Sequence, residues 1–119
     1  MQVIANVPIH QATGLGVSWR SAAGRPHTPI VAGLQTSDGL LPVFGALNSE
    51  RFPRYERLDL SVNRLVPAGD GIVVLFASVD NVLARKNFFE YAYASDYSSR
   101  RGVTSTSPRS VFVGLTFRR

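Results

Sequence analysis

Three segments of the chain alternate between apolar and polar residues with a period of two. In the last of them, residues 109–117, every second position is apolar. These positions are Val111, Val113, Leu115 and Phe117. Because successive side chains of a strand point to opposite faces, the pattern predicts a β-strand with one continuous apolar face.

Residues 13–22 and 55–66 repeat this pattern. Their apolar faces carry Leu15, Val17, Trp19, Leu58, Leu60 and Val62. Residues 72–82 are apolar on both faces, which also predicts a strand. Residues 1–7 predict a partial strand that ends at Pro8, because proline has no N–H to donate to a ladder.

The connections between these strands alternate in length. Residues 7–12 and 67–71 form short links, whereas residues 23–54 and 83–108 form long segments rich in turn chemistry. Long loops on one side and short turns on the other are typical of membrane β-barrels. The pattern therefore predicts an all-β fold, in which about four to five antiparallel up-and-down strands form part of a transmembrane barrel wall.

Composition narrows the class of protein only slightly. The chain has 119 residues, 45% of them hydrophobic, and no apolar run near 18 residues, so no transmembrane helix is expected. The N-terminal residues lack the pattern of a signal peptide. The net charge is +5, but the basic residues are scattered, so we expect no nucleic-acid partner.

No set of residues predicts catalysis. The chain has no cysteine and two histidines, His10 and His27, which lie far apart in the sequence and are not expected to share a metal. A nucleophile elbow, a phosphate loop and paired carboxylates at catalytic spacing are all missing from the sequence. We therefore expect neither an enzyme nor a cofactor.

Four pieces of sequence, taken in order, carry a resemblance to a known family. They are Gly24-Arg25-Pro26-His27-Thr28-Pro29, the stretch Asn48-Ser49-Glu50-Arg51-Phe52-Pro53-Arg54-Tyr55-Glu56-Arg57-Leu58-Asp59-Leu60, the stretch Val79-Asp80-Asn81-Val82-Leu83-Ala84-Arg85-Lys86-Asn87, and the closing strand from Pro108 to Phe117. In this order the chain resembles the C-terminal barrel region of TonB-dependent outer-membrane receptors. The family usually ends on the aromatic residue, whereas here Arg118 and Arg119 follow Phe117.

The resemblance implies a location, a function and partners. Receptors of this family lie in the bacterial outer membrane and take up scarce large solutes such as iron chelates, vitamin B12 or oligosaccharides. The expected partners are the lipid bilayer, the rest of the barrel and plug of a parent receptor, and the barrel-assembly machinery, which would recognise Phe117. Because a membrane barrel needs at least about eight strands, we expect a fragment that is incomplete for transport on its own.

Two groups of residues are candidates for functional contacts. Arg20, Arg57 and Asp59 would face a barrel lumen, where they contact substrate or plug, or else form a paired ladder of charges across strands. The aromatic residues Phe88, Phe89, Tyr91, Tyr93 and Tyr97 would form either a girdle at the membrane interface or a loop that contacts ligand.

A soluble antiparallel β binding module with two long recognition loops is the alternative. The apolar face of the strands distinguishes the two hypotheses, because it contacts lipid in a barrel wall and a second sheet in a soluble sandwich. Made alone in water, the chain is expected to aggregate or oligomerise through this face and its unpaired edges.

Overall fold

The computed structural model describes residues 1–104 and 107–119, which form antiparallel β-strands with no helix among them. The expected all-β, antiparallel fold is thus confirmed for these residues. Two residues of the expected loop 83–108, at positions 105–106, lie outside the described residues. The strands are β1 (Gln2–His10), β2 (Thr13–Ala22), β3 (Pro26–His27), β4 (Ile30–Thr36), β5 (Gly39–Phe44), β6 (Glu50–Arg51), β7 (Tyr55–Ala68), β8 (Gly71–Asp80), β9 (Phe88–Tyr93), β10 (Arg100–Thr104) and β11 (Ser110–Arg118).

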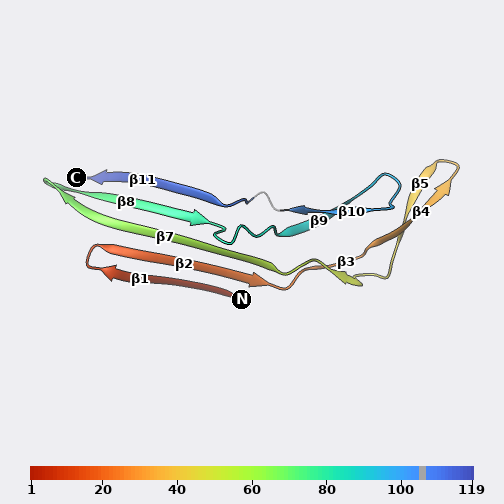
Figure 1. The fold of residues 1–119 in the computed structure, drawn as a ribbon, viewed down its shortest axis with the longest axis horizontal. Coiled ribbons are helices and arrows are strands. Elements are labelled where there is room, and N and C mark those ends of the chain that lie inside the picture. The colour runs from red at the N-terminus through yellow and green to blue at the C-terminus, as the bar shows by residue number, and fades with distance from the viewer. Residues whose placement is uncertain (105–106) are drawn as a thin grey trace. The chain divides into compact units, whose positions relative to one another are not determined.

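The chain divides into two units by its internal contacts (Figure 1). Unit 1 comprises Met1–Ser21, Glu56–Arg85 and Ser107–Arg119, and unit 2 comprises Ala22–Tyr55 and Lys86–Thr106. Unit 2 is therefore made of the two long segments that connect strands of unit 1. The part of the chain that the structure describes holds no helix long and apolar enough to cross a membrane.

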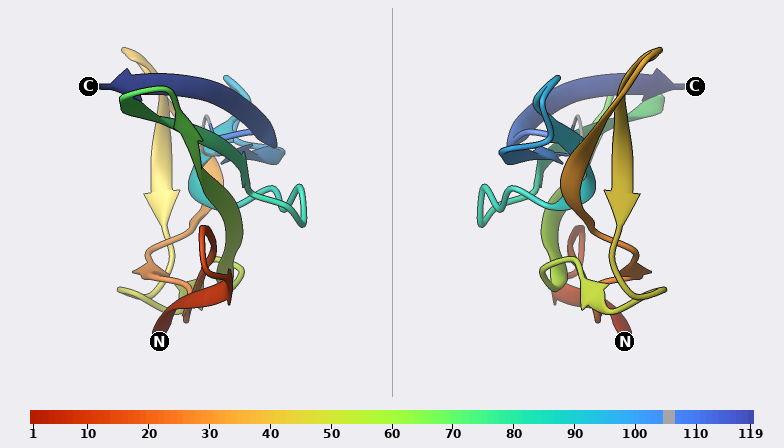
Figure 2. Two further views of the ribbon diagram at one scale, coloured as in Figure 1. Left: turned by 90° about the vertical axis from the view of Figure 1, so that its left-hand side faces the viewer. Right: turned by 90° about the vertical axis from the view of Figure 1, so that its right-hand side faces the viewer.

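Unit 1 is one open five-stranded sheet with the strand order β1-β2-β7-β8-β11. Two-residue turns join β1 to β2 and β7 to β8, and Gly69 supplies the positive φ, 60°, that such a tight turn needs. The Leu65 N–H donates to the Ala12 carbonyl at 2.8 Å, which places the β1–β2 turn toward the same end as the β7–β8 turn. Both long segments leave from the other end, and the sheet is visibly curved (Figure 2).

One face of this sheet is apolar across all five strands. Cross-strand partners share a face, and the registers pair Val113 with Ala77, Ala77 with Val62, and Val17 with Ala5. Leu15 lines the same surface hollow as Val62 and Val111, which joins β2 to this face. The apolar positions are Val3, Ala5, Val7, Leu15, Val17, Trp19, Leu58, Leu60, Val62, Val66, Val73, Leu75, Ala77, Val79, Val111, Val113, Leu115 and Phe117.

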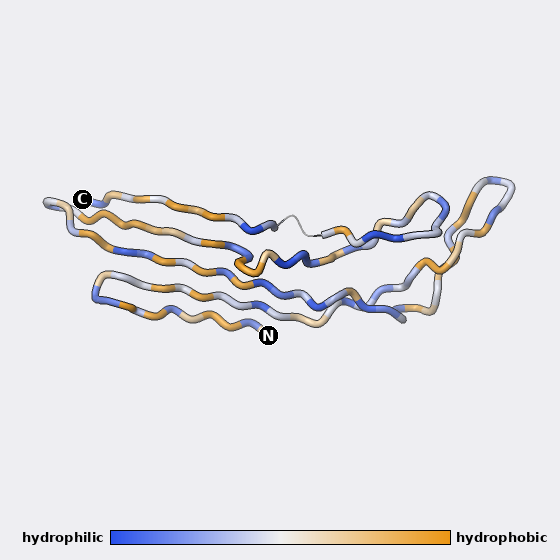
Figure 3. Tube along the Cα trace, viewed as in Figure 1, coloured by the Kyte–Doolittle hydropathy of each residue, from blue (hydrophilic) through white to orange (hydrophobic). Residues whose placement is uncertain are grey.

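Arg64 is the one charged residue that the β7–β8 register places on this face, opposite Leu75. It directly precedes Leu65, whose N–H meets the β1–β2 turn, so it lies level with that turn. Figure 3 shows the alternation of hydropathy along the strands, and the more continuous apolar character of β8. The opposite face of the sheet is mainly polar and is called the polar face below.

The apolar face has no layer over it within unit 1. No hydrophobic side chain among the described residues is buried, and Val113 and Leu115 are 77% and 69% exposed. A soluble sandwich would bury these side chains under a second sheet. Taken by itself, unit 1 is therefore a single layer held by its strand ladders.

Unit 2 corrects the expectation that residues 23–54 form only a long loop. This segment contains the β4–β5 hairpin and the short ladder that pairs β3 with β6, and the second long segment contains the β9–β10 hairpin. The turn chemistry that suggested loops marks the ends of these short strands. Ser37-Asp38, for example, form the turn of the β4–β5 hairpin, next to Gly39 with its φ of 125°.

The expected strand end at Pro8 is also wrong, because β1 continues to His10 and only Gln11 and Ala12 remain as a link. Pro8 is tolerated because β1 is an edge strand and the Pro8 nitrogen faces away from β2. Met1 bonds to Ser21 of β2, and because backbone groups alternate in direction along a strand, the even-numbered residues of β1 point outward. The other strands of the sheet differ from the expected ranges by at most two residues, and β2 coincides with residues 13–22.

Replacing Gly71 by alanine is expected to destabilise the sheet by about 1–3 kcal/mol. A Cβ at this position would lie 2.5 Å from the Arg118 carbonyl oxygen and 2.7 Å from Cζ of Phe117, so the last residues of β11 would have to move. Denaturant unfolding in detergent micelles measures the change. The neighbouring variant Asp70→Ala, which removes only the exposed ion pair with Arg119, is the control and should stay within about 0.5 kcal/mol of the parent chain. Equal stabilities of both variants would contradict the prediction.

Candidate functional site

An open groove of about 240 Å³ lies on the polar face of unit 1. Glycine makes room for it, because a Cβ on Gly16 would lie 2.4 Å from Ser61 Oγ. Ser18 Oγ is buried there without a hydrogen-bond partner. The lining residues are Ile4, Asn6, Gly16, Val17, Ser18, Asp59, Leu60, Ser61, Ser78 and Asp80. The groove therefore combines an apolar surface, to which Ile4, Val17 and Leu60 contribute, with hydroxyl, amide and carboxylate groups.

A network of charges lies at one end of this face. Arg57 Nε donates to both carboxylate oxygens of Asp59, at 2.7 and 2.9 Å, and Arg57 Nη2 donates to Asp80 Oδ2 at 3.0 Å. The charge of Arg20 also acts on Asp59. The structure thus brings together the three residues that the sequence predicted to share a face. The pairing of Arg57 with Asp59, and with Asp80 on the neighbouring strand, supports the paired charge ladder, and contact with a solute or plug stays a prediction.

Asn81 connects this network to the end of the sheet through its backbone and its side chain. Its N–H donates to Asp59 Oδ1 at 2.8 Å. Its side-chain Nδ2 donates to the carbonyls of Arg85 at 3.2 Å and Ser107 at 3.0 Å, and its Oδ1 accepts from the Arg85 N–H at 3.1 Å. The side chain is almost fully buried and φ is 49°, a conformation that asparagine tolerates better than most residues.

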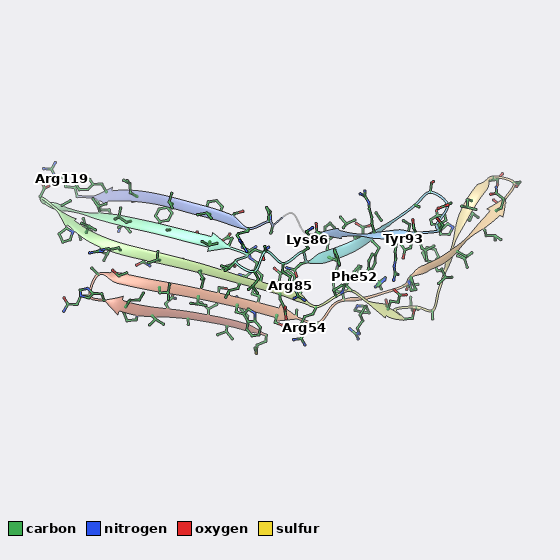
Figure 4. All side chains as sticks on the ribbon, in the orientation of Figure 1. Phe52, Arg54, Arg85, Lys86, Tyr93 and Arg119 are labelled. Atoms are coloured by element: carbon green, nitrogen blue, oxygen red, sulfur yellow. The ribbon has the colours of Figure 1, made fainter. Side chains whose placement is uncertain are left out.

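Two arginines complete this end of unit 1. Arg85 Nη1 lies 2.9 Å from Glu56 Oε2, and Arg109 Nη2 donates to the Val82 carbonyl at 2.6 Å. Arg85 is labelled in Figure 4. Together with Asn81, these contacts fix the backbone where the chain leaves β8 and where it enters β11.

Unit 2 contains an aromatic cluster that the sequence did not reveal. The rings of His27 and Phe52 stack with centroids 4.4 Å apart, and the Tyr91 ring lies 5.0 Å from Phe52 and 5.1 Å from His27. Arginines flank the cluster, with Arg100 4.5 Å from the Tyr91 centroid and Arg25 5.9 Å from that of Phe52. The cluster joins β3, β9, β10 and the residue after β6, and no periodic pattern in the sequence signals such a contact.

Glu50 forms an ion pair with Arg100, one of the two arginines that flank this cluster. Its carboxylate lies 2.6 Å from Arg100 Nη1, and Glu50 together with Tyr93 raises the pKa of the Arg100 guanidinium. His27 Nε2 lies 3.4 Å from the same carboxylate, but neither ring nitrogen of His27 makes a hydrogen bond of good geometry. We therefore assign the ion pair of Glu50 to Arg100 and treat the contact with His27 as packing.

The five aromatic residues predicted to act as one group have different surroundings. Phe88 lies over Gly102, where a Cβ would be 2.7 Å from the ring, whereas Tyr91 joins the cluster. The Tyr93 hydroxyl accepts from the Ile30 N–H at 3.1 Å. Phe89 is partly exposed, and its carbonyl accepts from Arg25. Tyr97 occupies the β9–β10 turn with φ of 59° (Figure 4 labels Phe52 and Tyr93).

The remaining candidate residues have structural surroundings of their own. Phe117 ends the apolar row of β11 and its ring lies against Gly71, so recognition of this residue by an assembly machinery stays a prediction. His10 belongs to unit 1 and His27 to unit 2. Within the described residues, no group of three or more histidine, cysteine, aspartate or glutamate side chains could hold a metal.

Comparisons with protein-family models, with curated proteins and with solved structures found no match to this chain.

Substitutions at Asn81 should separate its side-chain bonds from its backbone conformation. Asn81→Gly keeps the left-handed backbone and is expected to cost about 1–3 kcal/mol through lost hydrogen bonds. Asn81→Ala loses the same hydrogen bonds but keeps a Cβ in the left-handed region, so it is expected to be about 1 kcal/mol less stable than Asn81→Gly. Chemical unfolding in micelles gives both values, and the alanine variant should be the less stable. If the two variants were equally stable, the left-handed backbone at residue 81 would make no difference to the free energy of unfolding.

Proposed function

We propose that the five-stranded sheet of unit 1 forms part of the wall of a bacterial outer-membrane β-barrel of the TonB-dependent receptor type. The observation that carries the proposal is the apolar face, which extends from β1 to β11 with Arg64 as its one charged residue in the β7–β8 register, and which is exposed on β11. In a bilayer this face contacts lipid, and the polar face, with its groove and charges, lines the lumen.

The lengths of the strands support a membrane wall. β1, β2, β8 and β11 have 9 or 10 residues, close to the ~9–11 that a tilted strand needs to cross the hydrocarbon core. β7 is longer, with 14 residues, and extends past the β1–β2 turn. Arg64 lies level with that turn, where its long side chain can reach the headgroups.

The two kinds of connection support the orientation. Two-residue turns lie at one end of the sheet and the segments of unit 2 leave from the other, which matches short periplasmic turns and long extracellular loops. In this arrangement unit 2 provides surfaces that meet solute outside the cell. The wall needs further strands, because five are fewer than the roughly eight that close the smallest barrels.

Trp19 offers a direct test, since it is the only tryptophan and lies on the apolar face. After reconstitution into vesicles with brominated acyl chains, its fluorescence is expected to be strongly quenched. The double variant W19F/F112W, which moves the tryptophan to the polar face of β11, should be quenched less. Equal quenching of the two chains, or none, would contradict a lipid-facing apolar surface.

Val113→Arg is expected to lower the stability of the membrane-embedded sheet by about 2–4 kcal/mol, because it places a charge at mid-strand on the lipid face. Thr116→Arg, on the polar face of the same strand, is the matched control and should cost much less. Unfolding by urea in lipid vesicles compares the two. A neutral Val113→Arg would argue for a covering other than lipid.

A further inference from the structure

β11 is an edge strand of the five-stranded sheet, and the hydrogen bonds of the sheet show which of its backbone groups point outward. The Leu65 N–H donates to Ala12 in the β1–β2 turn. Backbone groups of successive residues in a strand point to opposite neighbours. The odd-numbered residues of β7 therefore bond toward β2 and the even-numbered ones toward β8.

The same alternation extends through the registers to β11. Leu60, Val62 and the other even positions of β7 pair with odd positions of β8, which leaves the even positions of β8 to bond β11. These pair with even positions of β11, such as Gly114 with Phe76. Val111, Val113, Leu115 and Phe117 therefore direct their N–H and C=O groups outward. No proline interrupts this row.

The other edge of the sheet is less suited to pairing. Met1 and Ser21 exchange two hydrogen bonds, with the Met1 nitrogen 2.6 Å from the Ser21 carbonyl and the Ser21 N–H 2.9 Å from the Met1 carbonyl. Odd positions of β1 thus bond β2 and even positions face outward. Pro8 is one of these outward positions and offers no N–H, and the register shifts directly after it.

We infer that the outer edge of β11 pairs in antiparallel fashion with β11 of a second copy of this chain. A two-fold axis at Gly114 places Val113 opposite Leu115 of the second copy and Val111 opposite Phe117. In this register the outward N–H and C=O groups meet their counterparts, and all nine residues of β11 are paired. A shift by two residues in either direction leaves strand residues at both ends unpaired.

The chemistry of β11 makes it complementary to itself. The residues with outward backbone groups are also those of the apolar face, so apolar side chains meet apolar side chains across the new edge. Ser110 meets Arg118 within the strand. The like charges Arg109 and Arg119 lie opposite each other just beyond it, where Arg109 donates to the Val82 carbonyl and Arg119 to Asp70. The pairing also continues the apolar face from one copy to the other, which shields the exposed Val113 and Leu115 on one side.

This dimer is distinct from the proposed barrel wall. The two-fold axis places the short turns of the two copies at opposite ends, whereas strands of one barrel keep all such turns on one side of the membrane. The dimer therefore belongs to the chain in micelles or before insertion. It uses the edge that a neighbouring strand of a barrel would use, so the two pairings compete.

Disulfide cross-linking tests the register, because the chain has no cysteine of its own. Phe112 and Thr116 of opposite copies form a pair without hydrogen bonds, about 4.5 Å apart at Cα, within the range for a disulfide. In detergent micelles, a mixture of F112C and T116C chains is expected to form a cross-linked dimer under mild oxidation. Either chain alone, or a mixture of S110C and T116C chains, is expected to remain largely uncross-linked. Failure of the first mixture, or equal cross-linking of all samples, would overturn the register.

Proline substitutions test which edge is used. Val113→Pro removes an outward N–H of β11, and Ile4→Pro removes one of β1, and neither group bonds within the sheet. Val113→Pro is expected to weaken dimerisation in sedimentation equilibrium by about tenfold or more, and Ile4→Pro should leave it unchanged. Circular dichroism checks that both variants keep their strands. Loss of the dimer in Ile4→Pro alone would overturn the inference, and quenching of Trp19 by lipid tests the barrel wall independently of either result.

Discussion

The ladder of backbone hydrogen bonds between strands is the interaction on which unit 1 depends. Most folded domains of this length gain their stability by burying apolar side chains, yet none is buried among the described residues here. Each strand is instead fixed by its neighbours in an up-and-down sheet, and the bonds of Asn81, Arg85 and Arg109 add further polar contacts where the chain leaves it. Such a single layer is stable only in a medium that accepts its apolar face, which links the fold directly to its proposed place in a bilayer.

Unit 2 is stabilised in a different way. Its short ladders involve as few as two residue pairs, as between β3 and β6, which is too little to hold strands by themselves. The stacked rings of His27, Phe52 and Tyr91 join these pieces, and arginines on either side add cation–π contacts and an ion pair with Glu50. In unit 2 a cluster of stacked aromatic rings thus takes the place of a buried apolar core.

The alternation of residues was sufficient to predict the sheet of unit 1, because a period of two places a whole row of side chains on one face. Positions such as Val113 and Leu60 therefore lie on the apolar face as expected, and Arg20, Arg57 and Asp59 lie together on the other. The extension of β1 through Pro8 could not be predicted, since it depends on which edge of the strand is free. The strands of unit 2 were missed because they are short and interrupted by turn residues, and the stack of His27 on Phe52 joins residues 25 positions apart without any repeating pattern.

The absence of a buried apolar layer in the described residues also has a thermodynamic consequence. The heat capacity of unfolding scales with the apolar surface that becomes exposed. Here much of that surface is already exposed in the folded sheet, for example on β1 and β11. The plot of the free energy of unfolding of unit 1 against temperature should therefore be closer to a straight line than that of a domain with a buried core, so heating destabilises the sheet whereas cooling does not bring it toward cold denaturation.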